Sequence, residues 1–360
     1  MRVLIAPDKF AGTLSAPEAA EAIARGWSRR APGDTLDLAP MSDGGPGFVD
    51  VLHASLGGEL LAVTVSGPHA ETVPGVVLVV GGTAYVESAQ ACGLHLESPP
   101  AASASTYGVG QLVAAAVDAG AKTVVVGLGG SGTNDAGAGL LAALGADADV
   151  DLRAGGAGLA GIGRIDVGPV RQRLDGVRLV AASDVDIPLT GMFGATKTFG
   201  PQKGVGEDDI ADLDASLERF AEVAGRRVAL DKGAGAAGGL GYALMLLGAV
   251  REPGISLVAE QVDLADRARR SDLVLTGEGA FDFSSRSGKV PYGVAEIAAG
   301  ALRPCVALAG QVLIGAREMR ALGVESAYSM VDLVGEERSF AAPGEVLADL
   351  AERVARTWSR

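Results

Sequence analysis

A glycine-rich segment, Gly127–Gly139, carries the side chains whose types and spacing point most clearly to chemistry. It reads GLGGSGTNDAGAG, directly after an apolar run and before a helical pattern. Its glycines let the backbone approach a ligand closely, and the N–H groups at a helix start form an anion site. An aspartate there could orient Mg²⁺ or accept a proton from a substrate hydroxyl. We expect substrate or phosphate to bind at Gly129, Gly130, Ser131, Thr133, Asn134 and Asp135.

Two other interpretations of this segment stay open. It could be a tight strand-to-helix turn, in which Asn134 or Asp135 only caps the helix. Gly127, Gly129 and Gly132 also match the G-x-G-x-x-G fingerprint of dinucleotide-binding proteins. That fingerprint needs a second strand ending in an acid, and the Ala-rich stretch that follows shows none, so the pattern does not favour nicotinamide binding.

A second motif, SDGG at Ser42–Gly45, follows an expected strand and opens a helix. Asp43 is the best candidate for a catalytic carboxylate, and Gly44 and Gly45 leave room beside it for a phosphate or a small acid. We therefore expect Ser42, Gly44 and Gly45 to contact substrate. The alternative is again a helix cap.

A pair of aspartates, Asp184 and Asp186, stands just beyond another apolar strand. Two carboxylates two residues apart point to one side of an extended chain, which suits Mg²⁺. We expect Asp184 to act in catalysis and to share a metal with Asp186. The alternative is a solvated turn. In FGPQKG, which follows, Lys203 offers a point charge for phosphate and Gln202 a hydrogen-bonding side chain.

Two further groups of charged residues are expected at the carboxyl ends of strands. Glu278 and Asp282 are expected on a loop after a strand, with the catalytic candidate Lys289 at the start of the next helix. Acids and a cation in this arrangement could hold Mg²⁺, with Glu278 as ligand, and phosphate; a salt-bridged surface loop is the alternative. At the tip of the first strand, Asp8 and Lys9 are candidates for binding phosphate.

Five of these motifs sit at the carboxyl ends of expected strands, where an α/β fold collects its ligand groups. Carboxylates, glycines and isolated lysines without a poised nucleophile suit phosphoryl transfer, which depends on placement, Mg²⁺ and cations. The chain contains no G-x-x-x-x-G-K-[ST] sequence and no protein-kinase signature. A phosphotransferase of this kind would be of an unusual type.

The elements that must position these groups form a βα rhythm at both ends of the chain. Ser15 and Glu18 make a capping box for a helix that should reach about Arg30. Between about Leu61 and Val86, short strands follow one another without a helix. We therefore expect a discontinuous α/β domain with a parallel sheet, from residues 1–65 and 272–360, and an inserted α/β domain of residues 66–271.

Composition limits the classes of function. The net charge of −14 argues against wholesale binding to nucleic acid or to an anionic membrane. The longest apolar runs are too short to span a bilayer, and the start of the chain lacks the apolar stretch of a signal peptide. Two distant cysteines and three scattered histidines do not form a zinc pattern or a disulfide framework. A cytoplasmic protein acting on a small molecule is expected, of unknown oligomeric state.

The motifs occur in the order found in one family. IAPDKFAGTLSA, PMSDGGPG, ESAQACGL, STYGVGQL, GLGGSGTNDAGAG, ASDVDIPLTG, FGPQKG, GAGAAGGLG and GEGAFD with GKVPYGVA span about Arg2–Ala309. The chain thereby resembles the bacterial glycerate kinases of the type that makes 2-phosphoglycerate. The resemblance implies two α/β domains, one flavodoxin-like and one inserted, with the active site in the cleft between them. It also implies ATP, Mg²⁺ and D-glycerate. Matching motif positions are Asp43, Asn134, Asp135, Asp184, Gln202, Lys203, Glu278 and Lys289.

The chain departs from the family pattern at several positions. Pro46 and Phe48 replace the usual Glu and Thr, Ala11 replaces Lys, and Ile187 replaces Asn. After GEG, a basic residue, Ile and a Gln-Thr pair give way to Ala280, Phe281, Ser284 and Ser285. Three hypotheses follow: a glycerate kinase, a kinase retuned to another small hydroxy acid, and an anion-binding homologue without catalysis.

Overall fold

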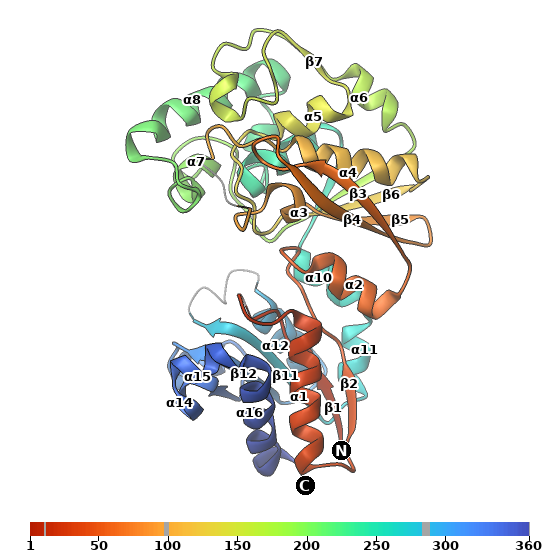
Figure 1. The fold of residues 1–360 in the computed structure, drawn as a ribbon, viewed down its shortest axis with the longest axis vertical. Helices are drawn as coiled ribbons and strands as arrows, with labels where there is room; N and C mark the ends of the chain where they lie inside the picture. The colour runs from red at the N-terminus through yellow and green to blue at the C-terminus, as the bar shows by residue number, and fades with distance from the viewer. Residues whose placement is uncertain (11, 97–100, 283–288, 360) are drawn as a thin grey trace. The chain divides into compact units, whose positions relative to one another are not determined.

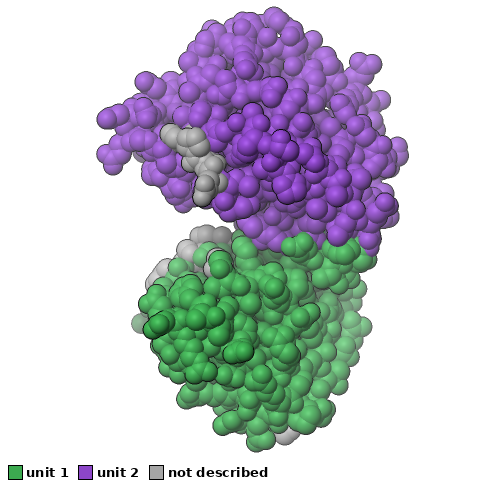
Figure 2. Space-filling model, viewed as in Figure 1, with its two compact units in different colours: residues 1–43, 50–57, 254–360 green, residues 44–49, 58–253 purple. Residues whose placement is uncertain are grey.

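The computed structural model describes residues 1–10, 12–96, 101–282 and 289–359. The chain divides into two compact units, which Figure 2 shows in two colours. Unit 1 comprises residues 1–43, 50–57 and 254–360, and unit 2 comprises residues 44–49 and 58–253. The first passage from unit 1 to unit 2 therefore lies inside the SDGG motif, between Asp43 and Gly44.

Unit 1 contains a parallel sheet of five strands in its described part (Figure 1). The strand order is β2-β1-β11-β12-β13, and every neighbouring pair is parallel. Numbered within the unit, this order is 2-1-3-4-5, which is the flavodoxin-like arrangement. The bounds are β1 Arg2–Ile5, β2 Thr35–Leu38, β11 Leu273–Phe281, β12 Cys305–Val312 and β13 Ser326–Ser329.

One face of this sheet is covered by α1, Ala16–Arg30, and α16, Pro343–Trp358. The predicted capping box at Ser15 and Glu18 is confirmed. The two helices pack so closely that a Cβ on Gly26 would lie 1.8 Å from the carbonyl oxygen of Ala348. Other helices described in unit 1 are α2 Phe48–Leu56, whose first two residues belong to unit 2, α10 Gly254–Gln261, α11 Leu264–Arg269, α12 Val290–Gly300, α13 Ala316–Ala321, α14 Met330–Val334 and α15 Glu336–Ala341.

Unit 2 is built on a mixed sheet with the order β10-β9-β6-β5-β4-β3. β3 and β4 form an antiparallel hairpin, β4 and β5 are also antiparallel, and the other pairs are parallel. The bounds are β3 Glu59–Ser66, β4 Thr72–Val80, β5 Thr83–Glu87, β6 Thr123–Gly127, β9 Arg178–Ala182 and β10 Val250–Glu252. The change from βα rhythm to consecutive strands, expected from the sequence, is thus present as β3–β5.

Helices pack on this sheet around a core rich in valine, leucine and alanine. They are α3 Ala89–Cys92, α4 Tyr107–Asp118, α5 Ala138–Leu144, α6 Gly168–Arg173, α7 Ala195–Phe199, α8 Ile210–Ala224 and α9 Leu240–Leu246. A short antiparallel pair, β7 Asp147–Ala148 with β8 Ile165–Asp166, lies between α5 and α6 in the sequence. Both units are therefore α/β, as the resemblance implied.

The structure corrects one expected element. Glu278 was expected on a loop after a strand, but it lies within β11, where it is the register partner of Ala309. The pairing with β12 continues to Phe281 and Val312. Glycines usually weaken a strand, but here the neighbouring strand supplies the hydrogen bonds that carry β11 through Gly277 and Gly279. No helix in the described part of the chain is long and apolar enough to cross a bilayer.

Candidate active site

The glycine-rich loop of unit 2 connects β6 to α5, and Asp135 fixes its end. The Asp135 carboxylate accepts hydrogen bonds from the backbone N–H groups of Gly137 and Gly139, at 2.9 and 3.1 Å. It also accepts from the N–H and the hydroxyl of Thr106, both at 2.8 Å. The side chain is fully buried, and burial raises the pKa of this carboxyl. These contacts favour the capping interpretation of Asp135 over contact with a ligand.

We therefore expect Asp135→Ala to destabilise the protein. The substitution leaves four buried donors without their acceptor, and one such loss costs about 1–3 kcal/mol. A fall of about 3 kcal/mol should appear as a lower midpoint in thermal or chemical denaturation. Asp208→Ala, at an exposed position of the same unit, is the control. Equal midpoints for the two variants would contradict the capping role.

A buried lysine is attached to the same loop. The Lys203 ammonium donates to the Ser131 hydroxyl at 3.0 Å and to the Thr133 carbonyl at 2.8 Å. Its side chain comes from a short 3-10 helix, Pro201–Lys203, and the residue is 8% exposed. Burial lowers the pKa of Lys203 to about 8. The loop thus carries a positive charge, while Gln202 beside it in sequence is exposed.

Asn134 adds an acceptor to the loop. Its side-chain amide donates to the Thr196 hydroxyl at 2.9 Å, and the residue is 1% exposed. Within the described chain, the amide oxygen of Asn134 has no hydrogen-bond partner. A buried acceptor without a partner is costly, so a ligand that donates a hydroxyl hydrogen bond would relieve this cost.

The ESAQACGL segment runs alongside the loop, and the buried Glu87 at its start was not singled out from the sequence. Two backbone hydrogen bonds join the segments: Gly132 N–H to Cys92 O at 2.6 Å and Leu94 N–H to Gly130 O at 2.9 Å. The Glu87 carboxylate is buried and accepts the N–H groups of Gly47 and Val49, at 3.0 and 3.4 Å. An acid ending the apolar strand Thr83–Glu87 was the available signal.

The two glycines of SDGG pack against the glycine-rich loop. The N–H of Gly129 donates to Gly44 O at 3.0 Å, and Gly44 has a φ of +90°. A Cβ on Gly129 would lie 2.5 Å from the Cα of Gly45. Side chains at these positions would push the two segments apart. Close packing therefore requires glycine here, and the contact with substrate stays a prediction.

Asp186, the second acid of the predicted metal pair, forms ion pairs with two cations. Arg251 contacts the Asp186 carboxylate at 2.6 Å and Lys232 contacts it at 3.4 Å. Arg251 also donates to the carbonyls of Ser183 and Val185, at 3.1 and 3.2 Å. These contacts favour a structural role for Asp186, in fixing the segment after β9 that carries Asp184.

In unit 1, the carboxyl ends of β1 and β2 lead to a pair of acids. Asp8 is 7% exposed, and its backbone N–H donates to Gly277 O at 2.8 Å. Burial is the main cause that raises the pKa of Asp8 to about 6; the negative charge of Asp43 adds to it and the charge of Lys9 opposes it. Lys9 contacts the Asp8 carboxylate at 3.6 Å. The structure thus brings these three predicted residues together.

The raised pKa of Asp8 predicts a pH dependence of stability. The folded chain holds this proton up to about pH 6, whereas an unfolded chain releases it near pH 3.8. Its contribution is complete below about pH 4 and is lost as the pH rises through 6. We expect Asp8→Asn to be more stable than wild type at pH 7.5, by about 1–3 kcal/mol, with the difference shrinking toward pH 4.

Denaturation midpoints of wild type and Asp8→Asn across this pH range would measure the effect. Glu325→Gln is the control variant, because Glu325 is exposed and lies in the same unit. Its difference from wild type should not change over this pH range. A constant difference between Asp8→Asn and wild type from pH 4 to 8 would contradict the raised pKa.

The third charged group in unit 1 consists of Glu278 within β11, Asp282 just after that strand and Lys289 before α12. The Lys289 ammonium lies 3.9 Å from the Glu278 carboxylate and 3.8 Å from the Asp282 carboxylate. Glu278 is 5% exposed, and Lys289 precedes α12 as its N-cap residue. These distances are long for charge-assisted hydrogen bonds. Lys289 therefore balances both acids without being tightly bound to either.

A metal ion was predicted at Asp184, Asp186 and Glu278, which belong to different units. Among the described residues, no cluster of three or more Asp, Glu, His or Cys side chains is arranged to hold one. Mg²⁺ usually needs only one or two protein carboxylates, because substrate phosphates and water complete its shell. Asp8, just after β1, and Glu278, within the neighbouring strand β11, fit that requirement. Burial raises the pKa of Asp8, and a bound cation would favour its charged form.

Several departures from the family pattern have structural explanations. Phe48 is fully buried and meets Tyr85 edge-on, with ring centroids 6.1 Å apart. Pro46 lies against the loop, since a Cβ on Gly130 would be 2.7 Å from its ring. Ile187 packs next to Gly235. Ala11, Ser284 and Ser285 lie outside the described residues.

The chain belongs to the glycerate kinase family, whose model matches residues 3–359. It is 39% identical to the glycerate kinase of Bacillus subtilis, over 99% of this chain and 96% of that protein. It is 37% identical to the glycerate 2-kinase of Escherichia coli, over 93% and 92% of the two chains. A crystal structure described as a candidate glycerate kinase 2 of Salmonella typhimurium LT2 has a TM-score of 0.83 and 35% identity, covering 99% of this chain and 98% of that one.

Proposed function

We propose that this chain is a glycerate kinase that transfers the γ-phosphoryl group of ATP to D-glycerate in the presence of Mg²⁺, forming 2-phosphoglycerate. The observation that carries the proposal is the length of the match: relatives named glycerate kinase align with both units at 37–39% identity. A cytoplasmic location stays a prediction of the sequence.

Unit 2 offers the features that a small hydroxy acid requires. Lys203 supplies a positive charge to the glycine-rich loop, and the buried oxygen of Asn134 can accept a hydroxyl hydrogen bond. A carboxylate would be attracted to the first group and a hydroxyl to the second. We infer that the loop at Gly129–Asn134 receives the organic acid. Asp184, which follows β9, stays a predicted catalytic residue and metal ligand.

Unit 1 offers the groups that phosphoryl transfer requires. Asp43 accepts the proton of the 2-hydroxyl of D-glycerate. The oxygen of that hydroxyl forms the new bond to the γ-phosphorus, while the bond between this phosphorus and the ADP oxygen breaks. Lys9 and Lys289 balance the charge on the transferred group. Asp8 and Glu278 would hold Mg²⁺, which shields the phosphate oxygens when bound.

The test is an assay of ADP release with ATP, Mg²⁺ and D-glycerate, followed by NMR of the product to locate the phosphate. Release of ADP that depends on D-glycerate, with phosphate on the 2-hydroxyl, is expected. Phosphate on the 3-hydroxyl would refute the proposed product, and no release with any hydroxy acid would refute the kinase.

A kinase retuned to another hydroxy acid is the second candidate. Its support was partly Phe48 and Pro46, whose packing gives them structural roles. A panel of hydroxy acids in the same assay separates the two candidates, because a glycerate kinase should use D-glycerate best by a wide margin.

A further inference from the structure

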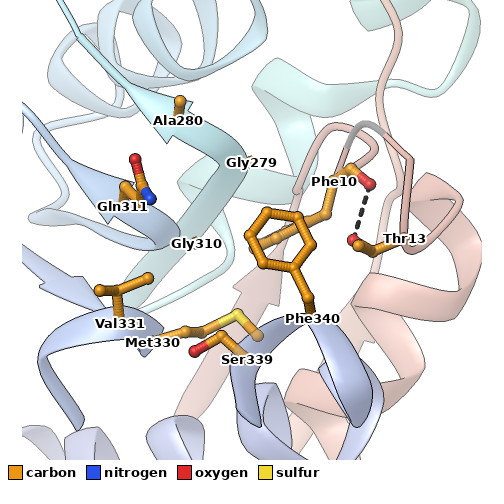
Figure 3. Close-up of a pocket in the computed structure, with 10 residues that line it drawn as sticks. All are labelled: Phe10, Thr13, Gly279, Ala280, Gly310, Gln311, Met330, Val331, Ser339 and Phe340. Carbon is orange, nitrogen blue, oxygen red and sulfur yellow. Dashed lines mark hydrogen bonds between the residues drawn. The ribbon is translucent and has the colours of Figure 1, made fainter. Parts of the chain in front are cut away.

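A cavity of about 220 Å³ lies in unit 1 at the carboxyl ends of β11 and β12 (Figure 3). The turn after β1 contributes Phe10 and Thr13, and the two strands contribute the backbone of Gly279 and Gly310. Met330 of α14 and Phe340 of α15 also line it. All of the described residues that line the cavity belong to unit 1.

The lining of this cavity suits a flat apolar group rather than a charged one. Among the described residues that line it, none has a charged side chain. Its two hydroxyl groups already donate to carbonyls, Thr13 to Phe10 at 2.9 Å and Ser339 to Gly335 at 2.7 Å. Phe340 is 59% exposed although it is large and apolar, whereas Phe10 is 2% exposed. An exposed aromatic ring beside an apolar hollow offers a stacking surface.

The cavity occupies the position where open α/β sheets bind their ligands. β1 has β2 on one side and β11 on the other, so the strand order reverses beside β1. Ligands of such sheets bind outside the carboxyl ends of the strands at this switch point. The cavity is formed by the segment that leaves β1 and by the ends of β11 and β12, and it therefore lies at that point.

Charged residues adjoin two of the lining residues in sequence. Lys9 directly precedes Phe10, and Glu278, with Lys289 at 3.9 Å, directly precedes Gly279. A ligand that fills the cavity and extends past the strand ends toward the two lysines would need an apolar flat end and an anionic end. Pockets for whole drug-sized ligands measure about 300–1,000 Å³, so a cavity of 220 Å³ fits one ring system rather than an entire nucleotide.

We propose that this cavity binds the adenine ring of ATP, with the triphosphate directed toward Lys9 and Lys289 in the same unit. The inference rests on the proposed function, because it takes ATP as the phosphoryl donor. It assigns the nucleotide to unit 1 and leaves the glycine-rich loop of unit 2 for the organic acid.

Two substitutions test the cavity directly. Phe340→Ala removes the exposed ring, and Val331→Trp places bulk at a partly buried lining position. Titration calorimetry of the full chain with ADP should show binding weaker by about tenfold or more in each variant, since one base–aromatic stack contributes about that much. Binding of inorganic tripolyphosphate, which has no base, should stay within about twofold of wild type.

Steady-state kinetics supply the second readout. The KM for ATP should rise in both variants, while kcat and the KM for D-glycerate stay near wild type. Leu302→Ala is the control, because Leu302 is 88% exposed and lies before β12, at the opposite end of the strand from the cavity. Thermal midpoints would verify that the variants are folded.

The possible outcomes separate this inference from the proposed function. One outcome is that wild type binds ADP more tightly than Phe340→Ala and Val331→Trp but does not phosphorylate D-glycerate. This result would support the adenine site and refute the proposed function. Wild type that phosphorylates D-glycerate, with ADP binding unchanged in both variants, would overturn the adenine site alone. Wild type that does not bind ADP would also overturn it.

Discussion

Asp43→Asn should reduce kcat by about 10²–10⁴ while the protein stays folded, because a general base contributes about that factor. Asparagine has nearly the same shape as aspartate but cannot take the proton of a substrate hydroxyl. The KM values for ATP and D-glycerate should change little, since the proton is transferred only in the reaction step. Steady-state assays at saturating ATP and Mg²⁺ would measure the loss.

The same variant has a second expected effect, on its neighbour. The charge of Asp43 contributes to the raised pKa of Asp8, so its removal should lower the pKa of Asp8 below about 6. In the Asp43→Asn protein, the pH dependence of stability described for Asp8 should move to lower pH. Denaturation midpoints between pH 4 and 8 would detect this shift without relying on activity.

Asp50→Asn is a suitable control, because Asp50 is exposed on α2 in the same unit. It should retain wild-type kcat and wild-type pH dependence. Near-normal turnover in Asp43→Asn would remove Asp43 from the mechanism and leave Asp184→Asn as the variant to examine. An unchanged pH dependence would show that the two acids of unit 1 do not interact.

Lys203→Met is expected to lower kcat/KM for D-glycerate by about 10²–10³, the effect of removing one preorganised donor from an anion site. Methionine keeps much of the apolar stem but loses the ammonium that binds Ser131 and Thr133. The loop then loses both a positive charge and the contact that sets its conformation. The KM for D-glycerate should rise much more than the KM for ATP.

The pH profile gives this prediction its clearest signature. Because the pKa of Lys203 is lowered to about 8, its charge is lost in the alkaline range that enzymes tolerate. Wild-type kcat/KM for D-glycerate should therefore fall above about pH 8. The small remaining activity of Lys203→Met should lack that decline.

Lys122→Met is the matched control, since Lys122 is exposed at the amino end of β6 in the same unit. It should behave as wild type in all of these measurements. If Lys203→Met instead raised only the KM for ATP, the organic acid would have been assigned to the wrong loop. Unchanged kinetics would make Lys203 a purely structural residue.

Local sequence patterns determined much of this fold. The capping box at Ser15 and Glu18 fixed the start of α1, because both hydrogen bonds form within one turn of chain. Alternation of βα patterns predicted the parallel sheet of unit 1. The consecutive strand patterns at β3–β5 predicted the passage into a second domain. The same patterns placed Asp8, Asp43 and Asp184 after strands, since strand ends follow from local hydrophobicity.

Tertiary structure alone decided which of these groups meet and what each one does. Lys203 reaches Ser131 across 72 positions of sequence, and no local pattern encodes that contact. Glu278 lies in a strand because β11 pairs with β12 as far as Phe281. Asp135 caps its helix because it accepts hydrogen bonds from buried donors, including those of Thr106. Burial and hydrogen-bond partners set the energy of a charged side chain, and both depend on segments distant in the chain. Residue type therefore shows what a side chain can do, and only packing decides whether it does so.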